Sequence, residues 1–479
     1  MSAPTLPTLP TPRTGVADVP PAVPSAGAAS YPARAALLDP ALVRALAAAA
    51  PERVGGVHAV VGLSVDVAGL PGAVGDLLEI GDAEQGTTVA EVVAATSSVL
   101  RCMPLGEVHG LRVGLPVRST GRPLLVPTGD ALLGRVLDGL GRPIDGKGPL
   151  GGGHAPVTGS APHALQRARV DTPLALGVRA LDTMTTVGRG QRIGLFAGSG
   201  VGKSSLLSMV ARGTEAEVSV IALVGERGRE VREFLEDDLG PEGLARSVVV
   251  VATSDEPPLV RLRAAFVATR IAETFREAGR DVVLMMDSLT RVAMAQREIG
   301  LSVGEPPATR GYPPSTFSLL AQLLERAGTA ERGSVTGIYT VLVDGDDHNE
   351  PIADAARSIL DGHVVLTRDL AVAGHFPSID VLGSVSRVAT RVTTKEQQAA
   401  ATRLRQVLAA RRRAQDLLDV GAYVTGSNPL VDAGVAHADA IDAFLRQGMD
   451  EVADAGRSWQ HLQALAGVLG APAAAGGAS

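Results

Sequence analysis

The segment Gly198-Ser-Gly-Val-Gly-Lys-Ser-Ser205 constrains this chain more than any other feature. Its glycines allow successive backbone N–H groups to point into one turn, where they can bind phosphate oxygens. Lys203 adds a positive charge for the terminal phosphates, and the hydroxyl of Ser204 suits Mg²⁺. We therefore predict a phosphate-binding loop made by Gly198, Ser199, Gly200, Val201, Gly202, Lys203, Ser204 and Ser205.

The surroundings of this loop support the same prediction. A strand-like apolar run covers residues 191–196, and a helix-like pattern begins near Lys203, whose amino end would add positive potential. The usual pattern G-x-x-x-x-G-K-[ST] has a glycine at its first position, where this chain has Ala197. Alanine is still small enough to fit there, so we favour a nucleotide site over a flexible Gly/Ser loop.

Composition limits the remaining possibilities. With 479 residues, 45% of them hydrophobic, the chain can form several globular domains. The net charge is −7, and the arginine cluster at residues 403–413 lacks interleaved aromatic side chains, so we expect no nucleic-acid partner. The single cysteine, Cys102, rules out an internal disulfide and fits a reducing compartment. We find no apolar span and no secretory signal, and expect a cytoplasmic protein.

The pattern along the chain predicts four regions. Residues 1–50 contain a Pro/Ala-rich tail, which we expect to be disordered, and a short amphipathic helix at residues 35–50. That helix could dock on another protein or pack on the next domain. Residues 51–120 alternate apolar and polar side chains, as at Val57, Ala59, Val61, Leu63, Val65 and Val67, which predicts an N-terminal β-barrel.

The third region, residues 121–388, includes a Gly/Pro-rich linker at residues 140–163, and from about residue 173 to 386 continuous apolar runs alternate with helical patterns. Such runs predict a parallel sheet covered by helices on both faces, which makes this an α/β domain. Residues 389–479 are predicted to be helical. There Thr393 and Glu396 fit a capping box, followed by Leu404, Val407, Leu408 and Leu417 on one face.

Two carboxylates follow buried strands of this domain. Asp287 ends the run at residues 282–286, and Glu226 follows the run at residues 218–224. The carboxyl ends of parallel strands meet at the edge where α/β sheets bind ligands. We therefore expect Asp287 to orient Mg²⁺ and Glu226 to polarise the attacking water. The alternatives are a solvated loop residue for Asp287 and a surface ion pair with Arg227 for Glu226, while Glu230 is predicted to be a helix-face charge.

Five motifs occur in one order along the chain: the phosphate-binding loop, Gly225-Glu-Arg227, Asp287-Ser-Leu-Thr-Arg291, Gly304-Glu-Pro-Pro-Ala-Thr-Arg-Gly-Tyr-Pro-Pro314 and Ser384-Val-Ser-Arg387. In these motifs the chain resembles the rotary and secretion ATPases of the F-type/V-type superfamily. Within that superfamily it looks like the flagellar-type type III protein export ATPases. The resemblance covers roughly residues 50–460 and implies a RecA-like P-loop nucleotide domain between an N-terminal β-barrel and a C-terminal helical domain.

The resemblance also implies roles for single residues. Glu226 would activate water, Arg227 would contact the nucleotide site, and Arg387 would enter the site of the neighbouring subunit. Phe376 aligns with a tyrosine that stacks on adenine in relatives, so stacking is kept and the phenol hydrogen bond is lost. The implied catalytic set is Lys203, Glu226, Arg227 and Arg387, the metal ligands are Ser204 and Asp287, and the cofactors are ATP and Mg²⁺.

The function implied by the resemblance is the ATP-hydrolysing motor of a bacterial flagellar export apparatus. A homohexamer would couple ATP hydrolysis to chaperone release, unfolding and export of flagellar substrates. Its implied partners are a dimeric stator or regulator at the N-terminal segment, a coiled-coil stalk in the ring, the export gate, chaperones and export substrates. It would associate only peripherally with the inner face of the cell membrane.

Other functions stay open at this point. A virulence injectisome ATPase would share every catalytic residue, although the segment Gly421-Ala-Tyr-Val-Thr-Gly-Ser-Asn-Pro429 looks like the flagellar branch. A non-catalytic F-type or V-type subunit would typically lack the carboxylate of Glu226. A catalytic F-type subunit would carry an acidic run in its C-terminal helices that is absent here. A helicase-like ring is disfavoured by the acidic net charge.

Overall fold

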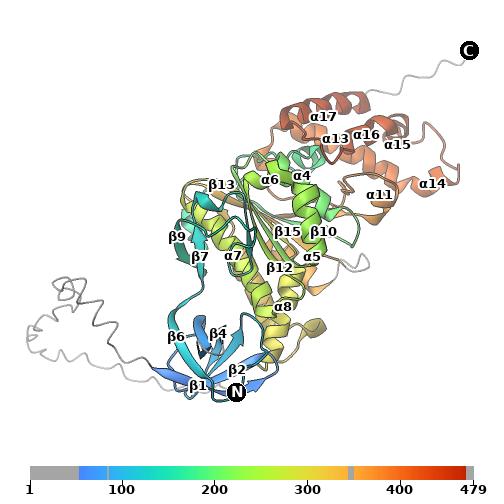
Figure 1. Ribbon diagram of the computed structural model, residues 1–479. Coiled ribbons are helices and arrows are strands. Elements are labelled where there is room, and N and C mark those ends of the chain that lie inside the picture. Colours follow the sequence, from blue (N-terminus) through green and yellow to red (C-terminus); the bar gives the residue numbers. More distant parts are fainter. Residues whose placement is uncertain (1–52, 83–85, 344–349, 471–479) are drawn as a thin grey trace, which may run out of the picture. The chain divides into compact units, whose positions relative to one another are not determined.

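The computed structural model describes residues 53–82, 86–343 and 350–470, which Figure 1 colours by sequence. The predictions of a disordered tail and of an amphipathic helix at residues 35–50 lie outside the described residues. The described chain contains an N-terminal barrel, a large sheet with helices on both faces, and a C-terminal group of helices. No described helix combines the length and the apolar character needed to cross a lipid bilayer.

Six strands form a closed barrel in the order β1-β2-β5-β4-β3-β6. Their bounds are β1 (Val54–Val61), β2 (Ser64–Ala68), β3 (Asp76–Asp82), β4 (Gly86–Ala95), β5 (Val99–Pro104) and β6 (Pro116–Pro123). Val57, Val65 and Val67 face the barrel core, as the alternation predicts. Val61 and Leu63 are 67% and 40% exposed because a turn at Gly62, with φ of 56°, joins β1 to β2 between them.

The segment between barrel and sheet is more structured than expected. Strand β7 (Leu125–Thr128) pairs antiparallel with β9 (Gly153–Pro156), and β8 (Arg135–Asp138) joins the edge of the large sheet. Residues 140–163 therefore do not form a plain linker, contrary to the prediction. Their Gly/Pro-rich composition hides the strand, because the pairing of β9 depends on backbone hydrogen bonds and not on an apolar pattern.

The large sheet has the strand order β17-β16-β10-β15-β13-β11-β12-β8, and β14 pairs beside β15. Its remaining strands are β10 (Arg192–Ala197), β11 (Val218–Glu226), β12 (Ser247–Thr253), β13 (Asp281–Asp287), β14 (Gly328–Thr329), β15 (Ser334–Leu342), β16 (Gly362–Leu366) and β17 (Val385–Ser386). Each strand in the stretch β16-β10-β15-β13-β11-β12-β8 is parallel to its neighbours in that stretch. Strand β14 is antiparallel to β15, and β17 is antiparallel to β16.

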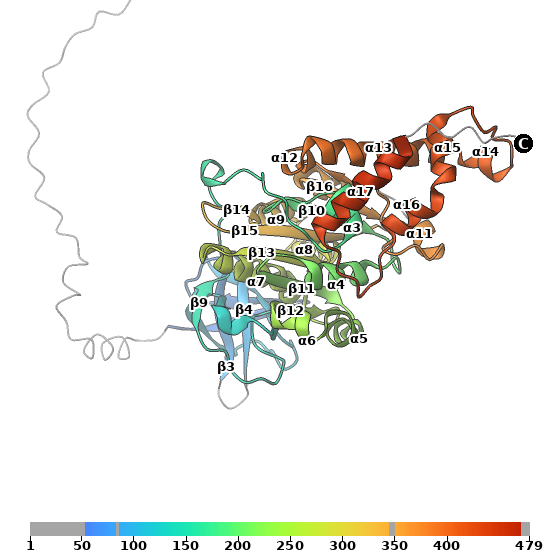
Figure 2. The same ribbon diagram turned by 90° about the horizontal axis from the view of Figure 1, so that it is seen from above.

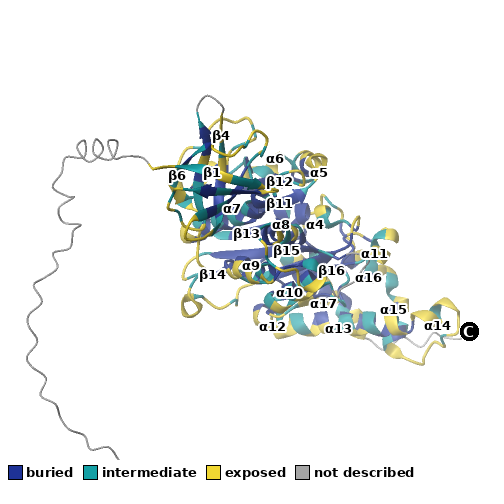
Figure 3. Cartoon of the chain, turned by 90° about the horizontal axis from the view of Figure 1, so that it is seen from below, coloured by how far each residue is buried: buried dark blue, intermediate teal, exposed yellow. Residues whose placement is uncertain are grey.

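Helices cover both faces of this sheet, which explains its continuous apolar strands (Figure 2). In β11, Val220 and Val224 face a core shared with the helices of residues 258–359, whereas Ile221 and Leu223 face the core on the opposite side. Figure 3 shows the sheet strands as a buried layer between these helices. The helices are α3 (Arg179–Met184), α4 (Lys203–Gly213), α5 (Gly228–Glu233), α6 (Gly240–Ala245), α7 (Pro258–Glu277), α8 (Leu289–Ser302), α9 (Pro314–Glu325), α10 (Pro351–Ile359) and α11 (Arg368–Val372).

The C-terminal region is helical, as predicted. It contains α12 (Ala389–Val392), α13 (Lys395–Arg413), α14 (Gln415–Asp419), α15 (Pro429–Ala436), α16 (Ala438–Leu445) and α17 (Ala455–Gly470). The capping box lies one residue later than predicted, at Thr394 and Gln397, because Thr393 donates its hydroxyl hydrogen bond to the carbonyl of Ala389. Leu417 is 50% exposed, contrary to the prediction, because α13 ends at Arg413 and Leu417 belongs to the separate short helix α14.

Candidate nucleotide-binding site

The phosphate-binding loop connects β10 to α4. Gly200 and Gly202 have φ values of 75° and 89°, a left-handed conformation that L side chains rarely adopt. Gly202 is also the N-cap of α4, so Lys203 is the first residue of this helix and lies at its positive end. Ala197 is the last residue of β10 and pairs with Leu342 and Leu366. A glycine is not needed there, because an extended strand accepts any small side chain.

A cavity of about 510 Å³ lies over this loop. It is lined by Ala197, Gly198, Ser199, Gly200, Gly202, Lys203, Ser204, Ser205, Glu226, Arg227, Glu230, Arg291, Leu342 and Val343. Of the predicted loop residues only Val201 is not at the surface of the cavity. It is buried, and its carbonyl accepts a hydrogen bond from Ser378 at 2.6 Å.

Lys203 connects the two predicted carboxylates. Its Nζ lies 2.6 Å from Oδ1 of Asp287 and 3.5 Å from Oε1 of Glu226. Burial acts to lower the pKa of Lys203, but the charges of Asp287 and Glu226 outweigh burial and raise it overall. The lysine is therefore firmly charged, which is the form that binds phosphate.

Asp287 is the last residue of β13 and is 3% exposed. Its carboxylate and the exposed hydroxyl of Ser204, in the first turn of α4, supply the hard oxygen ligands that Mg²⁺ prefers. The donor set therefore fits a magnesium ion held beside the phosphates of a nucleotide.

Glu226 ends β11 at the same edge of the sheet as Asp287. Burial raises the pKa of its carboxyl group, Lys203 opposes that shift, and Asp287 and Glu230 add to it. A raised pKa makes this carboxylate a better proton acceptor than an exposed one. Glu230 also lines the cavity. The sequence predicts only a charge on the exposed face of a helix at this position.

Arg227 reaches the rim of the cavity with a side chain that is 79% exposed, where it pairs with Glu230 at 3.0 Å. Such an exposed pair is weak and can be exchanged for a ligand at little cost in free energy.

The cavity also contains an arginine whose role the sequence did not reveal. Arg291, in the first turn of α8, lines the cavity, and its Nε is buried without a hydrogen-bond partner within the described residues. Its side chain packs on Gly225, where a β-carbon would come within 3.1 Å of Cβ of Arg291. Gly225 has φ of 71°, so the glycine is needed both for backbone conformation and for space.

The segment after β16 supports the loop from the other side. Arg368 donates a hydrogen bond to the carbonyl of Ser199 at 3.3 Å, and Ser378 donates to Val201. Between them Phe376 is 48% exposed, and its ring would lie 3.6 Å from a β-carbon at Gly202. Phe376 is therefore next to the loop and half-exposed, as an aromatic platform for a base requires.

Arg387 lies away from this cavity in the same chain. It follows β17, and its backbone N–H donates to the carbonyl of Asp361, which is bonded to Arg192 at the start of β10. The loop follows the other end of β10, six residues later. With a rise of about 3.3 Å per residue, the two ends of β10 are separated by about 16 Å. The exposed Arg387 thus lies near the end of β10 that is remote from its own nucleotide loop.

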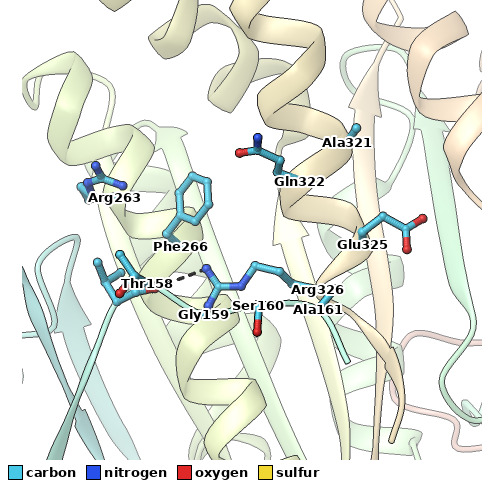
Figure 4. Close-up of a pocket in the computed structure, with 11 residues that line it drawn as sticks. Thr158, Gly159, Ser160, Ala161, Arg263, Phe266, Ala321, Gln322, Glu325 and Arg326 are labelled. Carbon is cyan, nitrogen blue, oxygen red and sulfur yellow. Dashed lines mark hydrogen bonds between the residues drawn. The ribbon is translucent and has the colours of Figure 1, made fainter. Parts of the chain in front are cut away.

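A second cavity of about 580 Å³ has a different character (Figure 4). Phe266 of α7 lies beside the guanidinium groups of Arg263 and Arg326, each 5.7 Å from the ring centre. Arg326 is paired with Glu273, and Arg263 is paired with Glu91 of the barrel. Because carboxylates of the chain already neutralise both cations, this cavity suits nucleotide phosphates much less well than the loop does.

A left-handed glycine loop, a charged lysine at a helix start and two carboxylates at adjacent strand ends define a P-loop nucleotide-hydrolysing protein. The models of the ATP synthase alpha/beta family match residues 57–121 as its beta-barrel domain and residues 177–386 as its nucleotide-binding domain. The model of the T3SS EscN ATPase C-terminal domain matches residues 393–464. The chain belongs to the ATP synthase alpha/beta family and is an ATPase.

Known proteins resemble this chain over nearly all of their length. The Flagellum-specific ATP synthase of Bacillus subtilis (strain 168) is 50% identical over 420 residues, which cover 87% of this chain and 96% of the relative. The Type 3 secretion system ATPase of Xanthomonas euvesicatoria is 49% identical over 420 residues, with 87% and 95% covered. The assembled ATPase EscN of enteropathogenic E. coli, solved with its central stalk EscO, superposes with a TM-score of 0.80 at 41% identity, covering 86% of this chain and 100% of that chain.

Proposed function

We propose that this chain is the Mg²⁺-dependent ATPase motor of a bacterial flagellar type III export apparatus. The observation that carries the chemistry is the contact of Lys203 with both Asp287 and Glu226 beneath the phosphate-binding loop. The assignment to flagellar export follows from its relatives, since the Bacillus protein and its Treponema counterpart, 52% identical over 403 residues, are both named flagellum-specific.

The residues of the site would divide the work of hydrolysis. Backbone N–H groups of the loop and Lys203 Nζ bind the terminal phosphates, while Ser204 and Asp287 hold the metal. Bound Mg²⁺ supplies positive charge to the phosphate oxygens. Glu226 accepts a hydrogen bond from the attacking water and takes its proton as the oxygen approaches the γ-phosphorus. Arg227 and Arg291 lie where they can contact phosphate oxygens, and Phe376 stacks on the base.

Arg387 would complete the site of a neighbouring copy. It is exposed and lies at the edge of the sheet away from its own cavity, so it can contribute only in trans. An arginine supplied in this way stabilises charge on the transferring phosphate, an effect worth about 10³ to 10⁵ in rate in related chemistry. We therefore propose a closed homohexameric ring, because every site of such a ring receives Arg387 from the next copy.

The partners follow from this ring. EscN is solved with a central stalk, and we propose a coiled-coil stalk protein in the centre of this ring as well. The N-terminal segment would bind a dimeric stator or regulator, and the ring would act on chaperones, export substrates and the export gate. We place it in the cytoplasm, held peripherally at the inner face of the cell membrane. For its domains we propose bounds of 51–120, 121–388 and 389–479.

The second candidate is the ATPase of a virulence injectisome. The similarity to the Xanthomonas protein favours it, since that relative is nearly as similar as the flagellar ones. Both candidates use the same catalytic residues, so chemistry alone does not separate them.

The test is the amount of flagellin in the culture supernatant after Lys203→Ala is introduced into the source organism. We expect extracellular flagellin to collapse while the variant protein persists at its normal level. The exposed Lys147→Ala serves as a matched control and should export normally. Unchanged flagellin with Lys203→Ala would contradict the flagellar role and favour the injectisome.

A further inference from the structure

Thr340 contacts the carboxylate of Asp287 from the neighbouring strand of the sheet. Thr340 belongs to β15, which pairs with β10 on one side and β13 on the other. Its Oγ1 lies 2.8 Å from Oδ1 of Asp287 and 3.2 Å from the carbonyl of Met286. A hydroxyl donates only one proton, and the charged, nearer carboxylate oxygen is the stronger acceptor. Thr340 therefore donates to Asp287.

Asp287 has two oxygens, and they are used unequally. Oδ1 accepts from Lys203 and from Thr340, whereas within the described residues no hydrogen bond reaches Oδ2. Thr340 is completely buried and Asp287 is 3% exposed, so water does not compete for the hydroxyl bond. The threonine thus fixes the rotation of the carboxylate and leaves the second oxygen available.

Lys203 cannot hold this orientation during the reaction, because its ammonium group is also the ligand for the terminal phosphates. When Lys203 turns to a phosphate, Thr340 is the remaining side chain among the described residues that donates to Asp287. Without that hydroxyl the buried carboxylate would be free to rotate between orientations, of which only some suit a metal.

We propose that Thr340 is a positioning residue, which holds Asp287 in the orientation that binds the metal of the nucleotide complex. This inference rests on the proposed Mg²⁺-dependent function and adds a residue of β15 to it. Supporting residues of this kind change metal affinity or activity by about 10- to 100-fold when they are removed.

The test measures how strongly Mg²⁺ tightens nucleotide binding, with a fluorescent ADP analogue titrated in Mg²⁺ and in EDTA. Thr340→Val keeps the shape of the side chain and removes the hydroxyl. We expect its ADP affinity in EDTA to match that of the unsubstituted protein, and the tightening by Mg²⁺ to fall by about 10-fold. Thr340→Ser should restore the tightening. If the valine variant fails to fold, Thr340→Cys offers a similar size with a weak donor and should fall between valine and serine.

Thr336 provides a matched control on the same strand. It is also buried, but its hydroxyl accepts a hydrogen bond from Gly190 at the opposite end of β15. Thr336→Val should leave the Mg²⁺ effect intact. Equal tightening in the protein with Thr340→Val and in the unsubstituted protein, or an equal loss with Thr336→Val, would overturn the proposal.

Asp287→Asn separates this proposal from the function on which it rests. If this variant loses the Mg²⁺ effect while Thr340→Val keeps it, Asp287 binds the metal and only the role of Thr340 is wrong. If Asp287→Asn keeps the full Mg²⁺ effect, the metal role of Asp287 is wrong and the inference about Thr340 fails with it.

Discussion

Lys203 and Asp287, which are 84 residues apart in the sequence, form an ion pair of 2.6 Å in which their side chains are 13% and 4% exposed. The pair joins the helix after the phosphate-binding loop to the end of β13. An ion pair this deeply buried depends on both partners, because removal of one leaves an unpaired charge away from water.

The first prediction is therefore a coupling in stability between these two residues. Lys203→Met and Asp287→Asn should each lower the melting temperature, and the double variant should lose less than the sum of the two. We expect a coupling free energy of about 1 to 3 kcal/mol. Differential scanning calorimetry of the four proteins measures it.

The exposed pair of Arg232 and Glu236, at 2.8 Å, is the control cycle, and should give a coupling below about 1 kcal/mol. Strictly additive effects of Lys203→Met and Asp287→Asn would show that the ion pair contributes nothing to the stability of the site.

The second prediction concerns Glu226. Glu226→Gln keeps the size of the side chain and removes its ability to accept a proton, so nucleotide binding should persist. Hydrolysis should fall by about 10² to 10⁴. Phosphate release and binding of a fluorescent ATP analogue measure the two properties separately.

Glu233 gives a matched control on the neighbouring helix, because its exposed carboxylate pairs with Arg229 of the same helix and lies outside the lining of the cavity. Glu233→Gln should hydrolyse ATP at the normal rate. Full activity of the Glu226→Gln protein would require another residue to orient the water, and Glu230 at the rim would then be the first to test.

The third prediction is a pH dependence that comes from Asp182 in α3. This carboxyl group is 3% exposed, and burial raises its pKa to about 7, although Leu176 and Gly177 donate backbone hydrogen bonds that oppose the shift. The folded protein then binds a proton more tightly than the unfolded chain, whose reference pKa is 3.8. This contribution to stability is fully present below about pH 3.8 and is lost progressively as the pH rises from there to about 7.

Melting temperatures between pH 5 and pH 8 measure this effect when wild type is compared with Asp182→Asn. By linkage, the stability of wild type should fall by about 3 kcal/mol between pH 5 and pH 7 and then level off. Asp182→Asn should have a lower melting temperature at every pH, because its amide group faces the two N–H donors of Leu176 and Gly177. Its melting temperature should not show the fall with pH that Asp182 causes in wild type. Asp416→Asn at an exposed position should keep the slope of wild type. Parallel curves for wild type and Asp182→Asn would contradict the raised pKa.

The sequence predicts the parts of the site that depend on local pattern. Continuous apolar runs indicated buried parallel strands, so the placement of Glu226 and Asp287 at one sheet edge followed from topology. The confirmed barrel followed in the same way from the alternation at residues 57–67, which form β1 and β2. The capping box and one apolar face indicated the C-terminal helices, and the order of the five motifs carried the family resemblance.

Contacts between distant segments had no such local signal. Thr340 resembles any β-branched residue of a buried strand, and only the pairing of β15 with β13 brings it to Asp287. Ser378 binds Val201 across 177 residues of sequence, and nothing near Ser378 indicates that contact. The capping box shifted by one residue because Thr393 and Thr394 are equally good N-caps, and the bond of Thr393 to the preceding helix decides between them.

The last prediction tests whether each site is shared between copies. Glu226 lies in the cavity, whereas Arg387 lies at the opposite edge of the sheet, so a complete site would combine Glu226 of one copy with Arg387 of the next. Glu226→Gln and Arg387→Ala should each be almost inactive alone. In randomly mixed rings of both variants, roughly a quarter of the interfaces keep both residues intact, so ATP hydrolysis should partly recover. Mixing Glu226→Gln chains with chains that carry both substitutions creates no intact interface and should recover nothing. If mixed rings are verified by mass spectrometry and hydrolysis still does not recover, Arg387 does not act on the neighbouring site.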